Sequence, residues 1–138
     1  MLQAFTHYFL HFIAIGAIAY LYDKENWKNN WMILIATMLV DLDHVFANPV
    51  FDAERCGIGY HPMHTAPAII LYLLGVLFAK NQLLKLIFIG LLFHMFTDFT
   101  HCLWTFSKCG ECYYSSEIFK WVQQLSLNNQ LLNIFQSI

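Results

Sequence analysis

The chain has 138 residues and a formal net charge of −2. Hydrophobic residues make up 59% of it and aromatic residues 17%, whereas charged residues make up 12%, about half the usual share. The length allows one domain or one small bundle. No basic surface is available to neutralise phosphates, so nothing indicates nucleic acid as a partner, and the apolar composition indicates an integral membrane protein.

Four apolar runs follow one another along the chain and predict four helices. The first, Gln3–Tyr22, lacks a basic n-region and is too long for a signal peptide, so we expect an uncleaved first helix. The second begins at Trp31 and ends in Asp41–His44. The third opens at His61 and continues to Ala79, and the fourth covers Leu83–Phe106.

Each run approaches the roughly 20 residues that span a bilayer, although the second and third need tilt or partial burial to do so. The sequence therefore predicts an all-α protein, with a four-helix transmembrane bundle over residues 1–106. Residues 107–138 form a separate C-terminal turn and amphipathic helix, which Ser115 or Ser116 can cap. That helix is expected either to lie on the membrane or the bundle, or to pack against a second copy in a homodimer.

The fourth run contains the most informative motif, His94-Met-Phe-Thr-Asp98-Phe-Thr-His101. At about 100° per residue, Asp98 falls roughly 40° from His94, and His101 falls roughly 20° to the other side. All three side chains therefore project from one face of an apolar helix. Ionisable groups are costly in a membrane and seldom face lipid without a partner, so this face predicts a metal site.

The other histidines belong to the same end of the predicted bundle. In an up-down-up-down arrangement, the helix ends that carry all seven histidines and three aspartates lie at one membrane face. The candidate metal ligands are His7, His11, Asp41, Asp43, His61, His64, His94, Asp98 and His101. A polar network that fastens helices by hydrogen bonds is the alternative. It would not need carboxylates at that depth, since each of them requires a cation or a proton.

Imidazole and carboxylate ligands suit zinc, and iron or manganese less well. The ligands outnumber those of one tetrahedral zinc, so we expect two ions about 3.5–4 Å apart, bridged by an aspartate, that lower the pKa of a bound water toward ~7. Either Asp41 or Asp43 could bridge the ions or take the proton from water, and His44 could orient the leaving group. We therefore predict Asp43 and His44 as catalytic residues. Arg55 is either a substrate clamp for phosphate or carboxylate or an interfacial cation.

The cysteines and lysines bear on topology. Cys109 and Cys112 form a single Cys-x-x-Cys, a weak zinc signal, and Tyr113 follows in place of the His of a haem attachment site. If this face is extracytoplasmic, Cys56 and Cys102 could pair with each other or with these two. The lysine distribution places the loops around residues 24 and 80 in the cytoplasm, so the site is expected on the extracytoplasmic face.

The order of these motifs resembles a family of small bacterial inner-membrane proteins described as predicted metal-dependent hydrolases, some of them LexA-regulated. The resemblance covers roughly Phe5 to His101. It points to His7 or His11, Asp41, Asp43, His44, His64, His94 and Asp98. The family's third motif has a longer spacing than His61-Pro-Met-His64-Thr65, so His61 has no clear counterpart. The His94-x-x-x-Asp98 element is also similar to zinc-dependent phospholipase C.

Three functions are compatible with these residues. The first is a metal-dependent hydrolase at the membrane surface, acting on a lipid phosphoester or ester. The second is a membrane di-iron oxygenase, which His7-x-x-x-His11 fits loosely, although the His-x-x-His-His elements of that class are missing. The third is a metal or haem binder without catalysis. The aspartates argue against haem, which needs facing histidines but no carboxylates.

Overall fold

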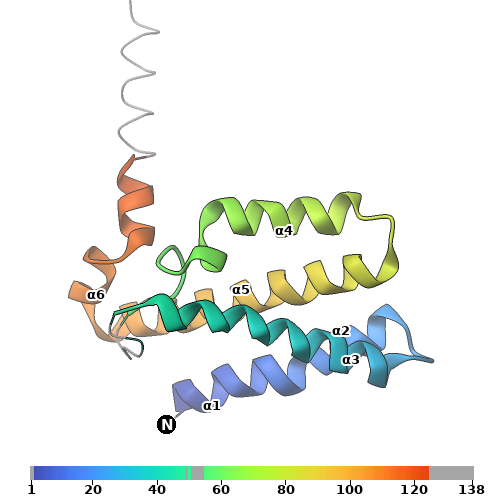
Figure 1. The fold of residues 1–138 in the computed structure, drawn as a ribbon. Coiled ribbons are helices and arrows are strands. Elements are labelled where there is room, and N and C mark those ends of the chain that lie inside the picture. Colours follow the sequence, from blue (N-terminus) through green and yellow to red (C-terminus); the bar gives the residue numbers. More distant parts are fainter. Residues whose placement is uncertain (1, 49, 51–54, 125–138) are drawn as a thin grey trace, which may run out of the picture.

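The computed structural model describes residues 2–48, 50 and 55–124, and these residues form helices joined by turns, without a strand (Figure 1). The predicted all-α fold is confirmed for this part of the chain. Predicted helical positions beyond residue 124, among them Leu125, Leu132 and Phe135, lie outside the described residues.

The first half of the chain folds into two helical rods. The first rod runs without interruption from Leu2 to Tyr22 as α1 (Leu2–Phe9), the π-helix η1 (Leu10–Ala14) and α2 (Ile15–Tyr22). The second rod consists of α3 (Trp27–Ala36), continued by the 3₁₀-helix η2 (Thr37–Phe46). Sequence periodicity predicts both rods, but it does not predict their π and 3₁₀ segments.

The second half contains the longest helix. A short 3₁₀-helix, η3 (Pro62–His64), precedes α4 (Ala66–Phe78). Asn81 caps the following helix, α5 (Gln82–Lys108), because its side-chain oxygen accepts hydrogen bonds from the amides of Leu83 and Leu84. The short helix α6 (Gly110–Tyr114) follows.

Residues 117–124 form a further helical segment after α6, and Ser116 caps it by accepting a hydrogen bond from the Phe119 amide. The predicted cap at Ser115 or Ser116 is therefore Ser116. Ile118 and Trp121 of this segment pack against the bundle.

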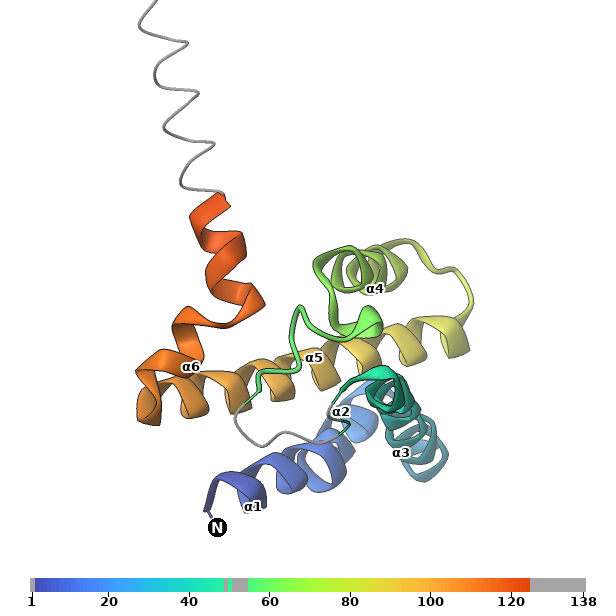
Figure 2. The same cartoon turned by 60° about the vertical axis from the view of Figure 1, so that its left-hand side comes forward.

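Helix α5 lies at the centre of the bundle, with α4 on one side and both rods on the other (Figures 1 and 2). One apolar cluster joins α2, α3 and α5 around the buried Ile15, Leu34 and Leu86. A second cluster joins α4, α5 and the 55–61 loop around Tyr72 and Met95. Because α5 contributes to both clusters, it sets the position of every element around it.

The N-terminal end of α1 is fastened to the C-terminal end of α5. The Gln3 amide donates to the Thr105 hydroxyl at 2.9 Å and accepts from Lys108 Nζ at 3.0 Å. The two helices are therefore antiparallel, and the first turns of α1 lie beside the second half of α5. This arrangement brings the histidines of α1 next to those of α5.

Two helices are long and apolar enough to cross a membrane, Leu2–Tyr22 and Gln82–Lys108, whereas α4 is apolar but shorter. Large apolar side chains lie on the outer surface of several elements. Leu21 is 79% exposed, Phe46 84% and Phe78 74%. Surfaces of this kind mark contact with lipid or another protein.

Gly75 allows α4 to approach α5, and this contact generates a stability prediction. A Cβ at Gly75 would lie 2.3 Å from the ring of Phe88. We expect Gly75→Ala to destabilise the protein, because overpacking costs about 1–3 kcal/mol and outweighs the gain of roughly 1 kcal/mol in helix propensity. Thermal unfolding in one detergent measures the change.

Gly110→Ala is the matched control, because a Cβ there meets no atom within 4 Å. Equal unfolding temperatures for the two variants would contradict the close packing of α4 on α5.

Candidate metal centre

A continuous chain of ring contacts joins all seven histidines of the protein. Successive rings have centroids between 3.7 and 5.5 Å apart. The order of contact is His101, His7, His11, His94, His64, His44 and His61. The histidines therefore gather at one end of the bundle, although they come from five helical elements and the 55–61 loop.

Four side chains form the first candidate metal group: Asp41, His64, His94 and Asp98. The two imidazole Nε2 atoms are 3.4 Å apart. Asp41 Oδ1 lies 3.3 Å from Nε2 of His64 and 3.0 Å from Nε2 of His94. Asp98 Oδ2 lies 3.3 and 3.2 Å from the same two nitrogens. Two imidazoles and two carboxylates thus converge on one point.

These separations fit a tetrahedral ion. Ligands placed tetrahedrally at about 2.0–2.2 Å from zinc lie roughly 3.3–3.6 Å from one another. The five separations above are 3.0–3.4 Å, close to that range. Two converging carboxylates also require positive charge between them. Burial lowers the pKa of His64, but its hydrogen bonds to Asp41 and Asp98 outweigh that effect and raise the pKa to about 10.

The second candidate group contains His7, His11 and, again, Asp98. Asp98 Oδ1 lies 3.3 Å from His11 Nε2 and 4.0 Å from His7 Nδ1. Nδ1 of His7 is buried and has no hydrogen-bond partner. A nitrogen in this state is available as a metal ligand. The sequence predicts Asp41 or Asp43 as the carboxylate that bridges two ions. The structure instead has Asp98 as the carboxylate whose two oxygens face two groups.

Asp43, His44 and His64 form the third group. Asp43 Oδ2 accepts a hydrogen bond from the Met63 amide at 2.8 Å and lies 3.2 Å from His64 Nδ1. Its Oδ1 lies 3.1 Å from His44 Nδ1. A carboxylate on Nδ1 fixes the imidazole tautomer that leaves Nε2 free as a ligand. Asp43 therefore orients His64 toward the first group.

The 3₁₀ geometry of η2 separates the roles of its polar residues. With three residues per turn, side chains at i and i+3 eclipse each other. Asp41 and His44 consequently share one face, which lines the cavity over the metal groups. Asp43 falls on another face, with Val40 and Phe46, beside an apolar groove. A 3₁₀ run of ten residues is unusual, since most runs stop at about four.

The π-helix η1 positions His11. Its i→i+5 hydrogen bonds widen the helix at Leu10–Ala14, and the Phe12 carbonyl accepts a hydrogen bond from the Trp31 indole at 2.8 Å. Trp31 also lies against Gly16, where a Cβ would approach the indole to 3.4 Å. The support that Trp31 gives to η1 could not be predicted from the sequence, because a π-turn has no signal in hydrophobic periodicity.

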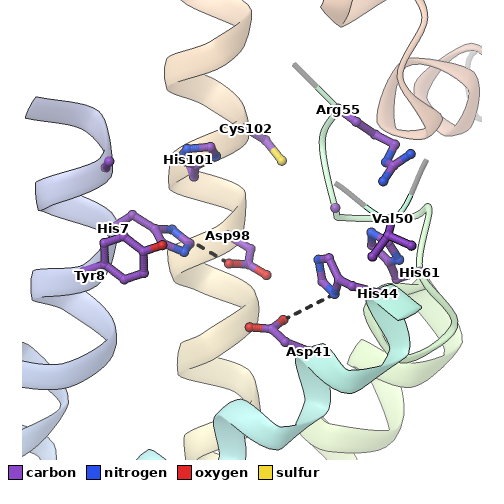
Figure 3. Close-up of a pocket in the computed structure, with 12 residues that line it drawn as sticks. His7, Tyr8, Asp41, His44, Val50, Arg55, His61, Asp98, His101 and Cys102 are labelled. Atoms are coloured by element: carbon purple, nitrogen blue, oxygen red, sulfur yellow. Dashed lines mark ion pairs between the residues drawn. The ribbon is translucent and has the colours of Figure 1, made fainter. Parts of the chain in front are cut away.

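A cavity of about 320 Å³ opens over the metal groups (Figure 3). His7 and Tyr8 enter it from α1, Asp98 and His101 from α5, and Asp41 and His44 from η2. Arg55 and His61 enter it from the loop; the Arg55 guanidinium lies 4.4 Å from the centre of the Tyr60 ring. Tyr8, like Trp31, had not been predicted from the sequence.

Two of the predicted ligands lie beside the three groups but are not members of them. His61 stacks on His44, with ring centroids 3.7 Å apart. Burial and the neighbouring His44 lower the pKa of His61 to about 4, so it stays neutral. His101 contacts His7, with centroids 5.0 Å apart. The structure thus brings every predicted ligand to this end of the bundle, with these two at its edges.

Residues 1–105 match the family of unknown function DUF6122, and the chain belongs to that family. The match covers the rods, α4 and nearly all of α5, and so includes every residue of the three metal groups. No curated protein and no solved structure matches the chain.

The hydrogen bond to the π-helix generates a prediction about Trp31. Trp31→Phe keeps an aromatic ring near Gly16 but leaves the Phe12 carbonyl without its donor, at a cost of about 1 kcal/mol. We expect a correspondingly lower free energy of unfolding in detergent. Trp27→Phe is the control, since the neighbouring Trp27 ring contacts Trp31 but no described hydrogen bond links its indole to η1. If both variants lose the same stability, the indole bond does not support η1.

Proposed function

We propose that the protein is a membrane-embedded, metal-dependent hydrolase that holds two ions of the zinc type and cleaves a lipid-associated phosphoester or ester. The observation that carries this proposal is the Asp98 carboxylate, with Oδ2 in one ligand group and Oδ1 in another. A carboxylate shared in this way is the bridge that two-metal hydrolytic sites use. Imidazole and carboxylate donors favour zinc, ahead of iron or manganese.

The two groups differ in how many ligands they offer. The group of Asp41, His64, His94 and Asp98 supplies four, which is the number that closes a structural zinc site. The group of His7, His11 and Asp98 supplies three, and catalytic zinc sites keep their fourth position open. His7 and Asp98 also line the cavity. Asp41 and Asp98 of the first group line it too, so the number of ligands separates the two positions. The second position, with three ligands, is the one at which substrate could bind.

When bound, the ions supply a water of lowered pKa and positive charge next to the scissile group. The protein supplies the proton transfers and the orientation. His44 lines the cavity, is 35% exposed, and has its Nδ1 held by Asp43. Its other ring nitrogen is thereby oriented to hand a proton to the leaving group, and Asp43 acts as a positioning residue for His44 and His64.

The positive charge of Arg55 indicates that the substrate is an anion. Its guanidinium lies over the Tyr60 ring and lines the same cavity as Asp41 and Asp98. A guanidinium suits a phosphate or a carboxylate, which it can bind through two parallel hydrogen bonds. An anionic phosphodiester is therefore favoured over a neutral ester.

The membrane part of the proposal rests on the apolar surface. Leu2–Tyr22 and Gln82–Lys108 have the length and hydropathy of membrane-spanning helices. The second rod and α4, which are shorter, complete the proposed four-helix bundle in the bilayer. The site then lies near the headgroup layer, at the end opposite Lys24 and Lys28, which places it outside the cytoplasm of a bacterial inner membrane. A substrate carried in the lipid phase reaches the cavity without leaving the membrane.

The four-ligand group also favours a second candidate function, metal binding without catalysis. A site closed by four protein ligands holds an ion firmly and leaves no position for substrate. In that case the cavity would serve the entry of the ion.

Metal stoichiometry tests the ligand assignment. We expect about two zinc ions per wild-type chain and none in Asp98→Ala, because this variant removes the carboxylate common to both groups. His7→Ala removes a ligand of the second group alone and should keep about one ion. Elemental analysis of protein purified in detergent gives both numbers.

Asp23→Asn is the control for these variants, since Asp23 is a carboxylate of the loop between the two rods and should not change the metal content. An Asp98→Ala protein with full metal content would show that the ligand assignment is wrong.

Hydrolysis of a p-nitrophenyl phosphodiester, with and without a chelator, tests the enzyme proposal. We expect chelation to abolish the activity and His44→Gln to lower kcat by about 10²-fold, as loss of a general acid does. Arg55→Gln should chiefly raise KM. A protein that binds two ions but hydrolyses neither phosphodiesters nor esters would be the non-catalytic metal binder.

A further inference from the structure

The described residues form two disulfide bonds, which differ in exposure. Cys56–Cys102 joins the 55–61 loop to α5 next to His101, and its two residues are only 8% and 1% exposed. Cys109–Cys112 lies at the turn from α5 into α6, where both residues are partly exposed. One bond is thus accessible from solvent and the other is enclosed.

The two bonds meet in one polar cavity of about 560 Å³, separate from the cavity over the metal groups. Cys56, Cys109 and Cys112 all line it. The remaining lining is largely hydroxyl and charged side chains: Arg55, Ser115, Ser116, Glu117 and Lys120. One cysteine of the enclosed bond therefore lines the same solvent-open cavity as both cysteines of the exposed bond.

The sulfur of Cys109 accepts a hydrogen bond from the backbone. The Cys112 amide donates a hydrogen bond to Cys109 Sγ at 3.1 Å. A thiolate is both the attacking and the leaving species in thiol–disulfide exchange, and a donor of this kind stabilises it in a Cys-x-x-Cys turn. This hydrogen bond also caps α6 at its N-terminus. The feature that a purely structural link would not need is the opening toward a second disulfide.

We propose that Cys109–Cys112 is a thiol–disulfide exchange site that takes two electrons from an external dithiol and passes them to Cys56–Cys102. A thiolate of the dithiol attacks Cys112 Sγ and Cys109 leaves as a thiolate. The second thiol of the dithiol then closes the donor's own disulfide and releases Cys112.

The transfer to the enclosed bond balances in the same way. The Cys109 thiolate attacks Cys56 Sγ, and Cys102 leaves and takes up a proton. Cys112 then attacks Cys109 Sγ, which reforms Cys109–Cys112 and releases Cys56 as a thiol. The net reaction oxidises one dithiol and reduces Cys56–Cys102, freeing the 55–61 loop from α5. Neither step involves a metal ion, so the proposal does not depend on the hydrolase.

The first experiment compares rates of reduction in the full chain in detergent. Excess dithiothreitol or reduced thioredoxin is added, thiols are alkylated at intervals, and mass spectrometry follows Cys56 and Cys102; the two arms distinguish a small dithiol from a protein dithiol. We expect the Cys109→Ser/Cys112→Ser variant to reduce Cys56–Cys102 at least about tenfold more slowly than wild type, because the enclosed bond then lacks its exchange partner.

Ser115→Ala is the matched control, since it alters the same cavity without removing sulfur, and it should react at the wild-type rate. Equal rates in wild type and the double variant, with either dithiol, would overturn the proposal. So would a wild-type protein in which Cys109–Cys112 is fully reduced while Cys56–Cys102 stays oxidised.

A trapping variant tests the same proposal without kinetics. In Cys112→Ser, the Cys109 thiolate has no partner to displace it, so a Cys56–Cys109 disulfide with a free Cys102 should accumulate. Peptide mapping under non-reducing conditions identifies it. An intact Cys56–Cys102 bond beside a free Cys109 in this variant would contradict the relay.

Discussion

The Asp98 carboxylate, 14% exposed among apolar helices, imposes the constraint on which the arrangement depends. A carboxylate in such a position needs positive charge close to it. Its two oxygens obtain this from different directions, since His11 lies 3.3 Å from one and His94 3.2 Å from the other. The polar groups that meet at this point come from the first rod, η2, η3 and α5. The bundle is thus organised around a charge that only a cation or shared protons can balance.

The helices achieve this convergence by departing from α geometry where they pass the site. The first rod becomes a π-helix at His11, and the second becomes a 3₁₀-helix through Asp41, Asp43 and His44. Each of these segments has poorer backbone hydrogen-bond geometry than an α-helix, and a side chain nearby supplies an additional hydrogen bond in each case. Trp31 satisfies the Phe12 carbonyl of η1, and the Thr37 hydroxyl donates to the Leu34 carbonyl at the start of η2. Irregular helices at functional sites are a common observation.

The candidate metal groups lie at one end of a bundle that contains two helices long and apolar enough to span a membrane. The two candidate groups adjoin the same cavity, the four-ligand group through Asp41 and Asp98 and the three-ligand group through His7 and Asp98. Arg55, His44 and Tyr8 also line that cavity. The loop that carries Arg55 is tied to α5 by Cys56–Cys102. The residues that the proposed function uses for substrate binding and proton transfer, Arg55 and His44, therefore line one cavity, close to the disulfide that holds the loop. They lie at the end of a bundle with many exposed apolar side chains.

The sequence by itself determined the helices and the end of the bundle where the polar groups gather. Apolar runs of this length form helices because their backbone N–H and C=O groups must be hydrogen-bonded within the run. Four such runs connected antiparallel bring the histidines of Gln3–Tyr22, of residues 41–64 and of α5 to one end of the bundle. Only the tertiary structure decided that Asp98, in place of Asp41 or Asp43, lies between two groups, because that depends on how α1 and η2 approach α5. It also decided the roles within η2, since the 3₁₀ pitch aligns Asp41 with His44 on one face. Periodicity in an apolar run carries no information about that change of pitch. The pairing of Cys56 with Cys102 depends likewise on where a loop docks, and residue spacing does not encode this.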